Sequence, residues 1–182
     1  MQKLVPIALS TFLGPSAVAM ELAVNLEIPK LNVAEYHHPY VALWIERSDD
    51  SNVGTLAVWY DTKKRNNEGV KWLRDLRQWW RLGGRDLAMP VDGVSGATRP
   101  AGVHNLSFPG TQAVLAKLPA GKYNLAVEAA RETGGREVVK VPFQWDGKEN
   151  SGRRYMEFSK NRMGDVGKKL FFDLSNGVKF DD

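Results

Sequence analysis

Short segments in which apolar and polar residues alternate recur along the chain, and they constrain its fold more than any other feature. In residues 21–28, for example, Leu22, Val24, Leu26 and Ile28 fall on one face of an extended chain. The other segments of this kind are residues 40–47, 55–60, 103–108, 113–118, 123–131, 137–145 and 169–174. Turn-forming residues separate most of them. About eight short strands predict a mainly β protein, specifically an immunoglobulin-like antiparallel β-sandwich.

One segment, residues 68–82, has the period of a helix instead. Its apolar side would carry Trp72, Leu73, Leu76, Trp79 and Trp80, and its basic side Lys71, Arg74, Arg77 and Arg81. Asn66 or Asn67 would cap its start, and Gly83 and Gly84 would end it. We therefore expect one amphipathic helix in the sandwich. Residues 146–161 are polar and predict a long loop.

Residues 1–19 have the pattern of a secretory signal peptide. Lys3 precedes an apolar run over residues 4–13, which is too short to span a bilayer, and Ala17, Val18 and Ala19 form a small-residue cleavage site. We expect cleavage after Ala19. The remaining residues, 20–182, would form a single β-sandwich domain in the bacterial periplasm, without a membrane-spanning segment.

Composition excludes several classes of chemistry. The chain has no cysteine, so disulfides, thiolate catalysis, iron–sulfur clusters and Cys-attached haem are all excluded. Its net charge of +4 favours acidic partners, whereas nucleic acid is not expected for an exported chain without a recognition motif. Redox chemistry in such a chain would need a borrowed cofactor.

Residues 92–98 read Asp-Gly-Val-Ser-Gly-Ala-Thr and show neither helical nor strand periodicity, which predicts an exposed loop. Asp-x-x-Ser-Gly-Ala-Thr resembles the acceptor motif of extracytoplasmic flavoproteins, in which a flavin transferase attaches FMN through its phosphate to the last hydroxyl. The resemblance implies covalent FMN on Thr98, with the transferase recognising the preceding residues Asp92, Gly93, Ser95, Gly96 and Ala97. Arg99 would pair with the flavin phosphate. A plain turn, in which Asp92 caps and the glycines fill left-handed positions, stays open as the alternative.

A second resemblance covers most of the chain beyond the signal peptide. Residues 38–46, 72–81, 92–100 and 119–123 are together similar to the predicted periplasmic family called domain of unknown function 2271. Its members are linked by gene context to flavin transferases and to membrane proteins of iron-reduction systems. The resemblance implies redox work outside the cytoplasm, with a membrane redox protein or an acidic periplasmic protein as partner.

Three functional hypotheses follow. The first is a periplasmic electron relay that carries FMN on Thr98 and serves iron reduction or uptake. It would be an electron carrier or accessory protein rather than a stand-alone enzyme. The second is a non-catalytic binding or assembly module without a cofactor, which would dock a partner through sandwich edges or through Arg74, Arg77 and Arg81. The third is iron or copper binding at His37 and His38, although adjacent residues on an extended chain point to opposite faces.

Several residues also have a purely structural interpretation. The basic side of the predicted helix would then be a solvated face, and Trp72, Trp79 and Trp80 would be core residues instead of stacking on a flavin ring. His104 has no predicted partner, and no nucleophile motif supports a hydrolase triad around it.

Overall fold

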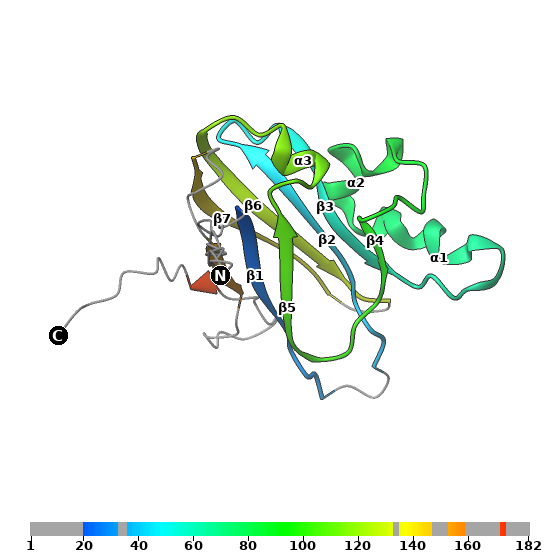
Figure 1. Cartoon of the computed structure of the whole chain (residues 1–182). Coiled ribbons are helices and arrows are strands. Elements are labelled where there is room, and N and C mark those ends of the chain that lie inside the picture. Colours follow the sequence, from blue (N-terminus) through cyan, green and yellow to red (C-terminus); the bar gives the residue numbers. More distant parts are fainter. Residues whose placement is uncertain (1–19, 33–35, 133–134, 147–152, 159–171, 174–182) are drawn as a thin grey trace, which may run out of the picture.

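Two β-sheets pack face to face in the computed structural model (Figure 1). The structure describes residues 20–32, 36–132 and 135–146, and it describes the backbone of residues 153–158 and 172–173. The predicted signal peptide and its cleavage site lie outside the described residues. So do parts of the predicted loop at 146–161 and of the predicted closing strand at 169–174.

The larger sheet has five strands in the order β4-β3-β2-β6-β7. Their bounds are β2 Tyr40–Arg47, β3 Asn52–Tyr60, β4 Ser95–Ala97, β6 Gly121–Ala130 and β7 Arg136–Trp145. β2 pairs antiparallel with both β3 and β6, and β6 and β7 form the antiparallel hairpin that the sequence predicts. β4 is the exception because it joins the edge of β3 in parallel.

The smaller sheet has the order β5-β1-β8-β9. It consists of β1 Glu21–Ile28, β5 Gly102–Pro109, β8 Arg153–Phe158 and β9 Phe172–Asp173. β1 pairs antiparallel with β5 but parallel with β8. The mainly β, two-sheet prediction is confirmed, but the sheets are not antiparallel throughout. Long connections, such as residues 61–94 between β3 and β4, let a strand re-enter its sheet in parallel. The immunoglobulin-like assignment stays a prediction.

The main core lies between the two sheets. The four apolar side chains predicted for β1 are buried there, opposite Val41, Leu43 and Ile45 of β2. The alternating residues of β2, Ala42 and Trp44, are buried in a second cluster on the other face of the five-stranded sheet. This sheet is therefore apolar on both faces, which explains why β2 carries so few polar residues.

A bulge changes the predicted face of one residue in β3. The register of β2 against β3 shifts between Leu43 and Trp44, which pair with Ala57 and Thr55, so Leu56 is the extra residue. Leu56 consequently shares the inter-sheet core with Ala57, while Val58 packs on the opposite face. The strict alternation expected for residues 55–60 is wrong at this point because a bulge adds one residue to one strand.

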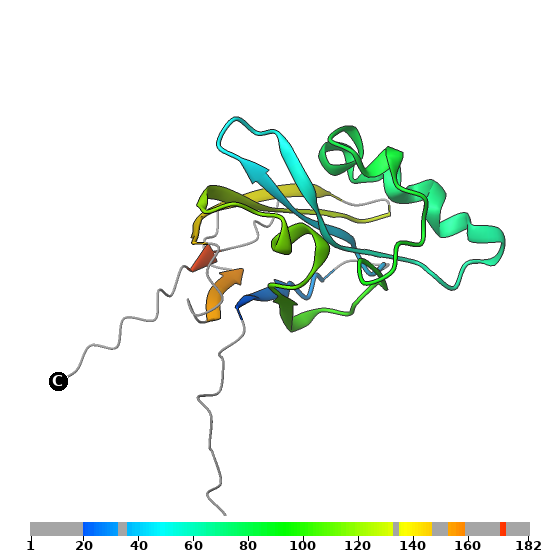
Figure 2. The same cartoon turned by 45° about the horizontal axis from the view of Figure 1, so that its top comes forward.

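A helical segment covers the outer face of the five-stranded sheet, on the side away from β1 and β5 (Figure 2). It is not the single helix predicted for residues 68–82. It consists of short turns: η1 Arg65–Asn67, α1 Glu68–Lys71, η2 Trp72–Asp75, α2 Arg77–Arg81 and η3 Gly84–Asp86. Leu76, at ψ 71°, interrupts the helical backbone between η2 and α2. Asn67 precedes α1 in a left-handed conformation without a side-chain capping bond. Gly83, at φ 140°, comes after α2 as predicted, but Gly84 begins the further turn η3 and so does not end the segment.

The break at Leu76 also changes the apolar side of this segment. Leu73, Leu76 and Trp79 are fully buried, as predicted, but Trp72 is 40% exposed and Trp80 is only half-buried. A 3₁₀ turn has three residues per turn, so a pattern read at 3.6 residues does not continue through η2. Trp72 therefore lies outside the core.

Two further segments differ from their predictions. Residues 113–118, predicted as a strand, contain the helix α3 Ala113–Ala116, whose Leu115 is buried together with Leu118. That i, i+3 spacing suits a helical turn, and six residues are too few to separate the two periods. β8 lies within the predicted loop at 146–161. It is held by parallel backbone pairing with β1, which does not require an apolar pattern in its own sequence.

Candidate functional site

Residues 91–98 form a tight turn that leads into an edge strand. The Val91 carbonyl accepts hydrogen bonds from the amides of Val94 (3.2 Å) and Ser95 (2.9 Å), and the Ser95 hydroxyl accepts one from the Val91 amide (2.9 Å). From Ser95 the chain runs beside β3 as β4. The expected loop is thus partly a strand, because pairing with an open sheet edge uses backbone groups and requires no apolar alternation.

The two glycines of the motif have different structural roles. Gly93 has a φ of 69°, in the left-handed region that favours glycine, and a Cβ added there would meet no atom within 4 Å. Gly96 lies against the ring of Trp59, where an added Cβ would be 3.3 Å from Cδ1. Gly93 therefore sets the backbone of the turn, while Gly96 permits close packing.

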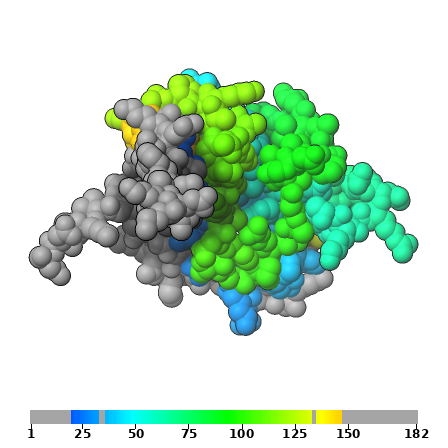
Figure 3. All heavy atoms as spheres, viewed as in Figure 1, coloured from blue at the N-terminus to red at the C-terminus, as the bar shows by residue number. Residues whose placement is uncertain are grey.

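Thr98 lies just beyond the end of β4. Its amide donates a hydrogen bond to the Tyr60 carbonyl (3.1 Å), which fixes the backbone, and its side chain is half-buried. No described residue is a hydrogen-bond partner of its hydroxyl. Asp92 and Ala97 are exposed, and the Asp92 carboxylate accepts no hydrogen bond from the described amides of the turn. The segment containing β4 and β5 forms part of the molecular surface (Figure 3, green).

Trp59 and Arg99 form a contact that the sequence does not predict. The Arg99 guanidinium carbon lies 4.1 Å from the centroid of the Trp59 ring, a cation–π arrangement, and burial lowers the pKa of Arg99. His104 of β5 meets the same ring edge-on at 5.9 Å, and one of its ring nitrogens lies 2.8 Å from the Pro100 carbonyl oxygen. These contacts join the residues after Thr98 to both sheets. His104 thus has partners, and they are structural ones.

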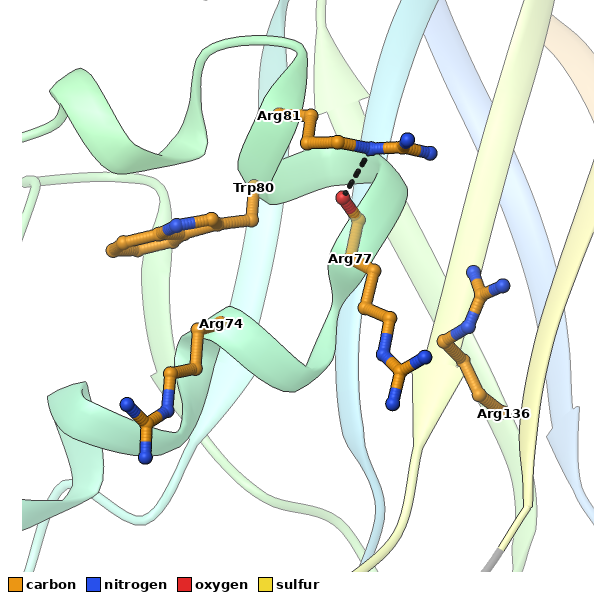
Figure 4. A pocket seen from close by; sticks show the side chains of 5 residues that line it. All are labelled: Arg74, Arg77, Trp80, Arg81 and Arg136. Atoms are coloured by element: carbon orange, nitrogen blue, oxygen red, sulfur yellow. Dashed lines mark hydrogen bonds between the residues drawn. The ribbon is translucent and has the colours of Figure 1, made fainter.

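Four arginines and a tryptophan line an open pocket of about 390 Å³ at the opposite edge of the five-stranded sheet (Figure 4). Arg74, Arg77, Trp80 and Arg81 come from the helical segment, and Arg136 comes from the start of β7. We call these five residues the arginine pocket. Three of the basic residues predicted for the helical segment thus line a concave surface together with Arg136 of β7. The helical period alone could not indicate the contribution of a distant strand.

A buried carboxylate holds the two walls of the arginine pocket together. Glu128 of β6 is fully buried and pairs with Arg136 at 2.7 Å. Its two oxygens also accept hydrogen bonds from the amides of Gln78 (3.1 Å) and Trp79 (2.8 Å), at the start of α2.

The tryptophans of the helical segment differ in burial. Trp79 is a core residue, and its indole donates a hydrogen bond to the Thr55 hydroxyl. The prediction that these tryptophans are core residues is therefore confirmed for Trp79 and wrong for Trp72, which is 40% exposed. Trp80 is half-buried, so it is only partly a core residue.

The histidine pair does not form a metal site with described neighbours. His37 Nδ1 lies 3.8 Å from a carboxylate oxygen of Glu132, and the ring of His38 lies edge-on to that of Tyr36 at 5.9 Å. Across the described ranges, no three His, Cys, Asp or Glu side chains are grouped so that they could hold a metal ion. Metal binding at His37 and His38 would need ligands from elsewhere.

Comparisons with known proteins identify a family but no characterised relative. No curated protein and no solved structure matches the chain. None of the helices in the described part is both long and apolar enough to cross a membrane. The model of one family, described as "Predicted periplasmic protein (DUF2271)", matches residues 21–158, which include every residue of the turn and of the arginine pocket. The chain belongs to this family of predicted periplasmic proteins.

Proposed function

We propose that this protein carries FMN covalently on Thr98 and relays electrons in the periplasm. The observation that carries the proposal is the state of the Thr98 hydroxyl. It stands at the end of an edge strand, after a tight exposed turn, and no described residue is its hydrogen-bond partner. The sequence of the turn, Asp-x-x-Ser-Gly-Ala-Thr, resembles the acceptor motif of flavin-transferase substrates.

The attachment would be a phosphoryl transfer catalysed by a flavin transferase. The Thr98 oxygen forms a bond to the FMN phosphorus of a flavin dinucleotide, the diphosphate bond breaks, and the nucleoside monophosphate leaves. The hydroxyl proton passes to a base of the transferase. The product is a phosphodiester with one negative charge, and the protein gains the mass of FMN less one water.

The surrounding residues fit this product. Gly93 has open space around it, so a transferase can approach the turn closely. The Arg99 guanidinium lies over the Trp59 ring and has no described carboxylate as partner, which leaves N–H groups for the phosphodiester of the neighbouring residue. Bound flavin would supply the electron transfer, while the chain supplies the tether, the counter-charge and the rigid edge.

The electron partners are proposed from the family's gene context and from charge. A membrane redox protein of an iron-reduction or uptake system would exchange electrons with the flavin. A net charge of +4 favours an acidic docking surface on that partner or on another periplasmic protein. The protein would then be an electron carrier or accessory protein and not a stand-alone enzyme.

Intact mass spectrometry tests the proposal. The full chain is exported together with a flavin transferase, and the purified protein is expected to gain the mass of FMN less water and to keep flavin absorbance after denaturation. Thr98→Ala should abolish both. Thr111→Ala, in an exposed turn before α3, is the matched control and should be modified like the wild type. An unmodified wild-type chain, or a Thr98→Ala variant that still carries flavin, refutes the proposal.

The second candidate function, a binding module without a cofactor, is favoured by the arginine pocket. Under this alternative the purified protein is colourless, and ligand binding survives Thr98→Ala but weakens when Arg74, Arg77 and Arg81 are neutralised. Because the pocket and Thr98 are at opposite edges of the sheet, the two functions can be tested separately.

A further inference from the structure

We propose that the arginine pocket binds a phosphorylated small molecule, with its phosphate beside Arg77, Arg81 and Arg136 and a planar part of the ligand reaching across α2 to Trp80. This would be a second site, independent of Thr98. Three strands, β3, β2 and β6, separate β4 from β7. At about 4.8 Å per strand, the two edges are roughly 19 Å apart.

The first argument is uncompensated charge. The pocket has four arginines, and the buried Glu128 is paired with one of them, Arg136, so the charges of the other three are not balanced by it. No carboxylate among the described residues pairs with Arg74, Arg77 or Arg81. The guanidinium groups of Arg77 and Arg81 lie on the same side of α2 (Figure 4), and an anion with more than one charged oxygen would offset the repulsion between these charges.

The second argument is that two of the guanidinium groups are already positioned. Arg81 donates from Nε to the Arg77 carbonyl at 3.2 Å, and Arg136 donates to Glu128 at 2.7 Å. Figure 4 shows the guanidinium groups of Arg77, Arg81 and Arg136 on one side of α2 and the ring of Trp80 on the other. Arginines whose rotamers are held in place lose less conformational entropy when a ligand binds.

The third argument concerns the kind of anion. A guanidinium group can donate two parallel N–H bonds to one phosphate group. Sites that are rich in arginine and poor in carboxylates therefore suit phosphate esters. The pocket is concave, and its volume of about 390 Å³ falls within the range of small-molecule sites. Trp80 is half-buried and packs on Trp79 at a tilt of 54°, so it offers a fixed apolar wall. A flat anionic membrane would not use that concavity.

Titration calorimetry on the full exported chain with Thr98→Ala tests the proposal without covalent flavin. The probes are AMP, adenosine, inorganic pyrophosphate, and vesicles containing an anionic phospholipid. AMP and pyrophosphate should bind, and adenosine and vesicles should not. Arg77→Gln and Arg81→Gln should each weaken AMP binding about tenfold or more, because each removes charged hydrogen bonds. Trp80→Leu should weaken AMP binding but leave pyrophosphate binding unchanged.

Arg85→Gln is the matched control, because Arg85 is an exposed arginine of the same helical segment outside the pocket. It should leave the affinity for AMP unchanged. Failure of both AMP and pyrophosphate to bind overturns the proposal, as does an equal loss of affinity in Arg85→Gln, which would indicate unspecific attraction. Binding of vesicles alone would overturn it in favour of a membrane-docking surface. None of these outcomes depends on whether Thr98 carries FMN.

Discussion

Glu128→Gln tests whether one buried carboxylate holds the helical segment on the five-stranded sheet. Glu128 is fully buried and accepts three hydrogen bonds, from the Gln78 and Trp79 amides and from Arg136. A glutamine side chain has nearly the same shape. It has only one acceptor oxygen, however, and its NH₂ group would face N–H donors instead of accepting from them.

The expected loss follows from these contacts. The glutamine oxygen can take the position of Oε1 and keep the bonds from Gln78 and Arg136 in weaker, neutral form, whereas the Trp79 amide loses its acceptor. The lost bond costs about 1.5 kcal/mol and each weakened bond about 0.7 kcal/mol, so the free energy of unfolding should fall by about 3 kcal/mol. The hydrogen bond from Arg136 contributes less to the free energy of unfolding than a fully buried charged bond would, because the Arg136 side chain is 39% exposed. For a chain of 182 residues, a loss of this size lowers the melting temperature by about 6–12 °C.

Urea unfolding followed by tryptophan fluorescence measures this loss, since the chain has six tryptophans. Glu68→Gln is the matched control. Glu68 lies at the start of α1 and is 55% exposed, and its only described ion pair, with Lys71, is 3.7 Å long, so its removal should have almost no effect. If Glu128→Gln shifts the urea midpoint no more than Glu68→Gln does, the proposed anchoring role of Glu128 is wrong.

Two further predictions concern other parts of the five-stranded sheet and the turn. Lys140→Met should destabilise the fold by about 2–3 kcal/mol, because it leaves the fully buried Glu46 without the ammonium group now 2.6 Å away, and Glu46→Gln in the same chain should recover part of the loss in urea unfolding. Burial lowers the pKa of Lys140, but hydrogen bonds to Asp50 and Glu46 outweigh it and raise the pKa above its ordinary value of 10.5. The wild type should therefore keep this stabilisation below pH 10.5 and lose it as the pH rises through the folded-state pKa, whereas Lys140→Met should show a flatter pH dependence. Gly93→Ala should cost about 1 kcal/mol because of its positive φ, and a change near zero in urea unfolding would show that the turn relaxes.

The strands were predictable where a short alternating or apolar segment is bounded by turn residues. β1, β2, β5, β6 and β7 fall within two residues of their predicted ranges for this reason. β4 and β8 were not predictable, because they are held by pairing with β3 and β1, which lie far away in sequence. The apolar pattern predicts the position of the helical segment but not its break at Leu76, because one residue with a non-helical ψ does not change the spacing of the apolar residues.

The candidate sites were likewise predictable only where their residues are close together in the sequence. The turn at residues 92–98 was found because its residues are contiguous, so a short motif could reveal it. The contact of Arg99 with Trp59 and the arrival of Arg136 beside Arg77 depend on which strands are neighbours. No local spacing encodes that information. The helical spacing of basic residues indicates only Arg74, Arg77 and Arg81 among the residues of the arginine pocket.

The position of β1 has a consequence for the order of folding events. β1 comes first in the chain but lies inside its sheet, between β5 and β8. Its partners are residues 102–109 and 153–158, so both of its edges stay unpaired until those segments have emerged. Contacts this distant in sequence close slowly. The first described strand is thus one of the last to be completed, and until then it exposes backbone groups on which chaperones or proteases can act.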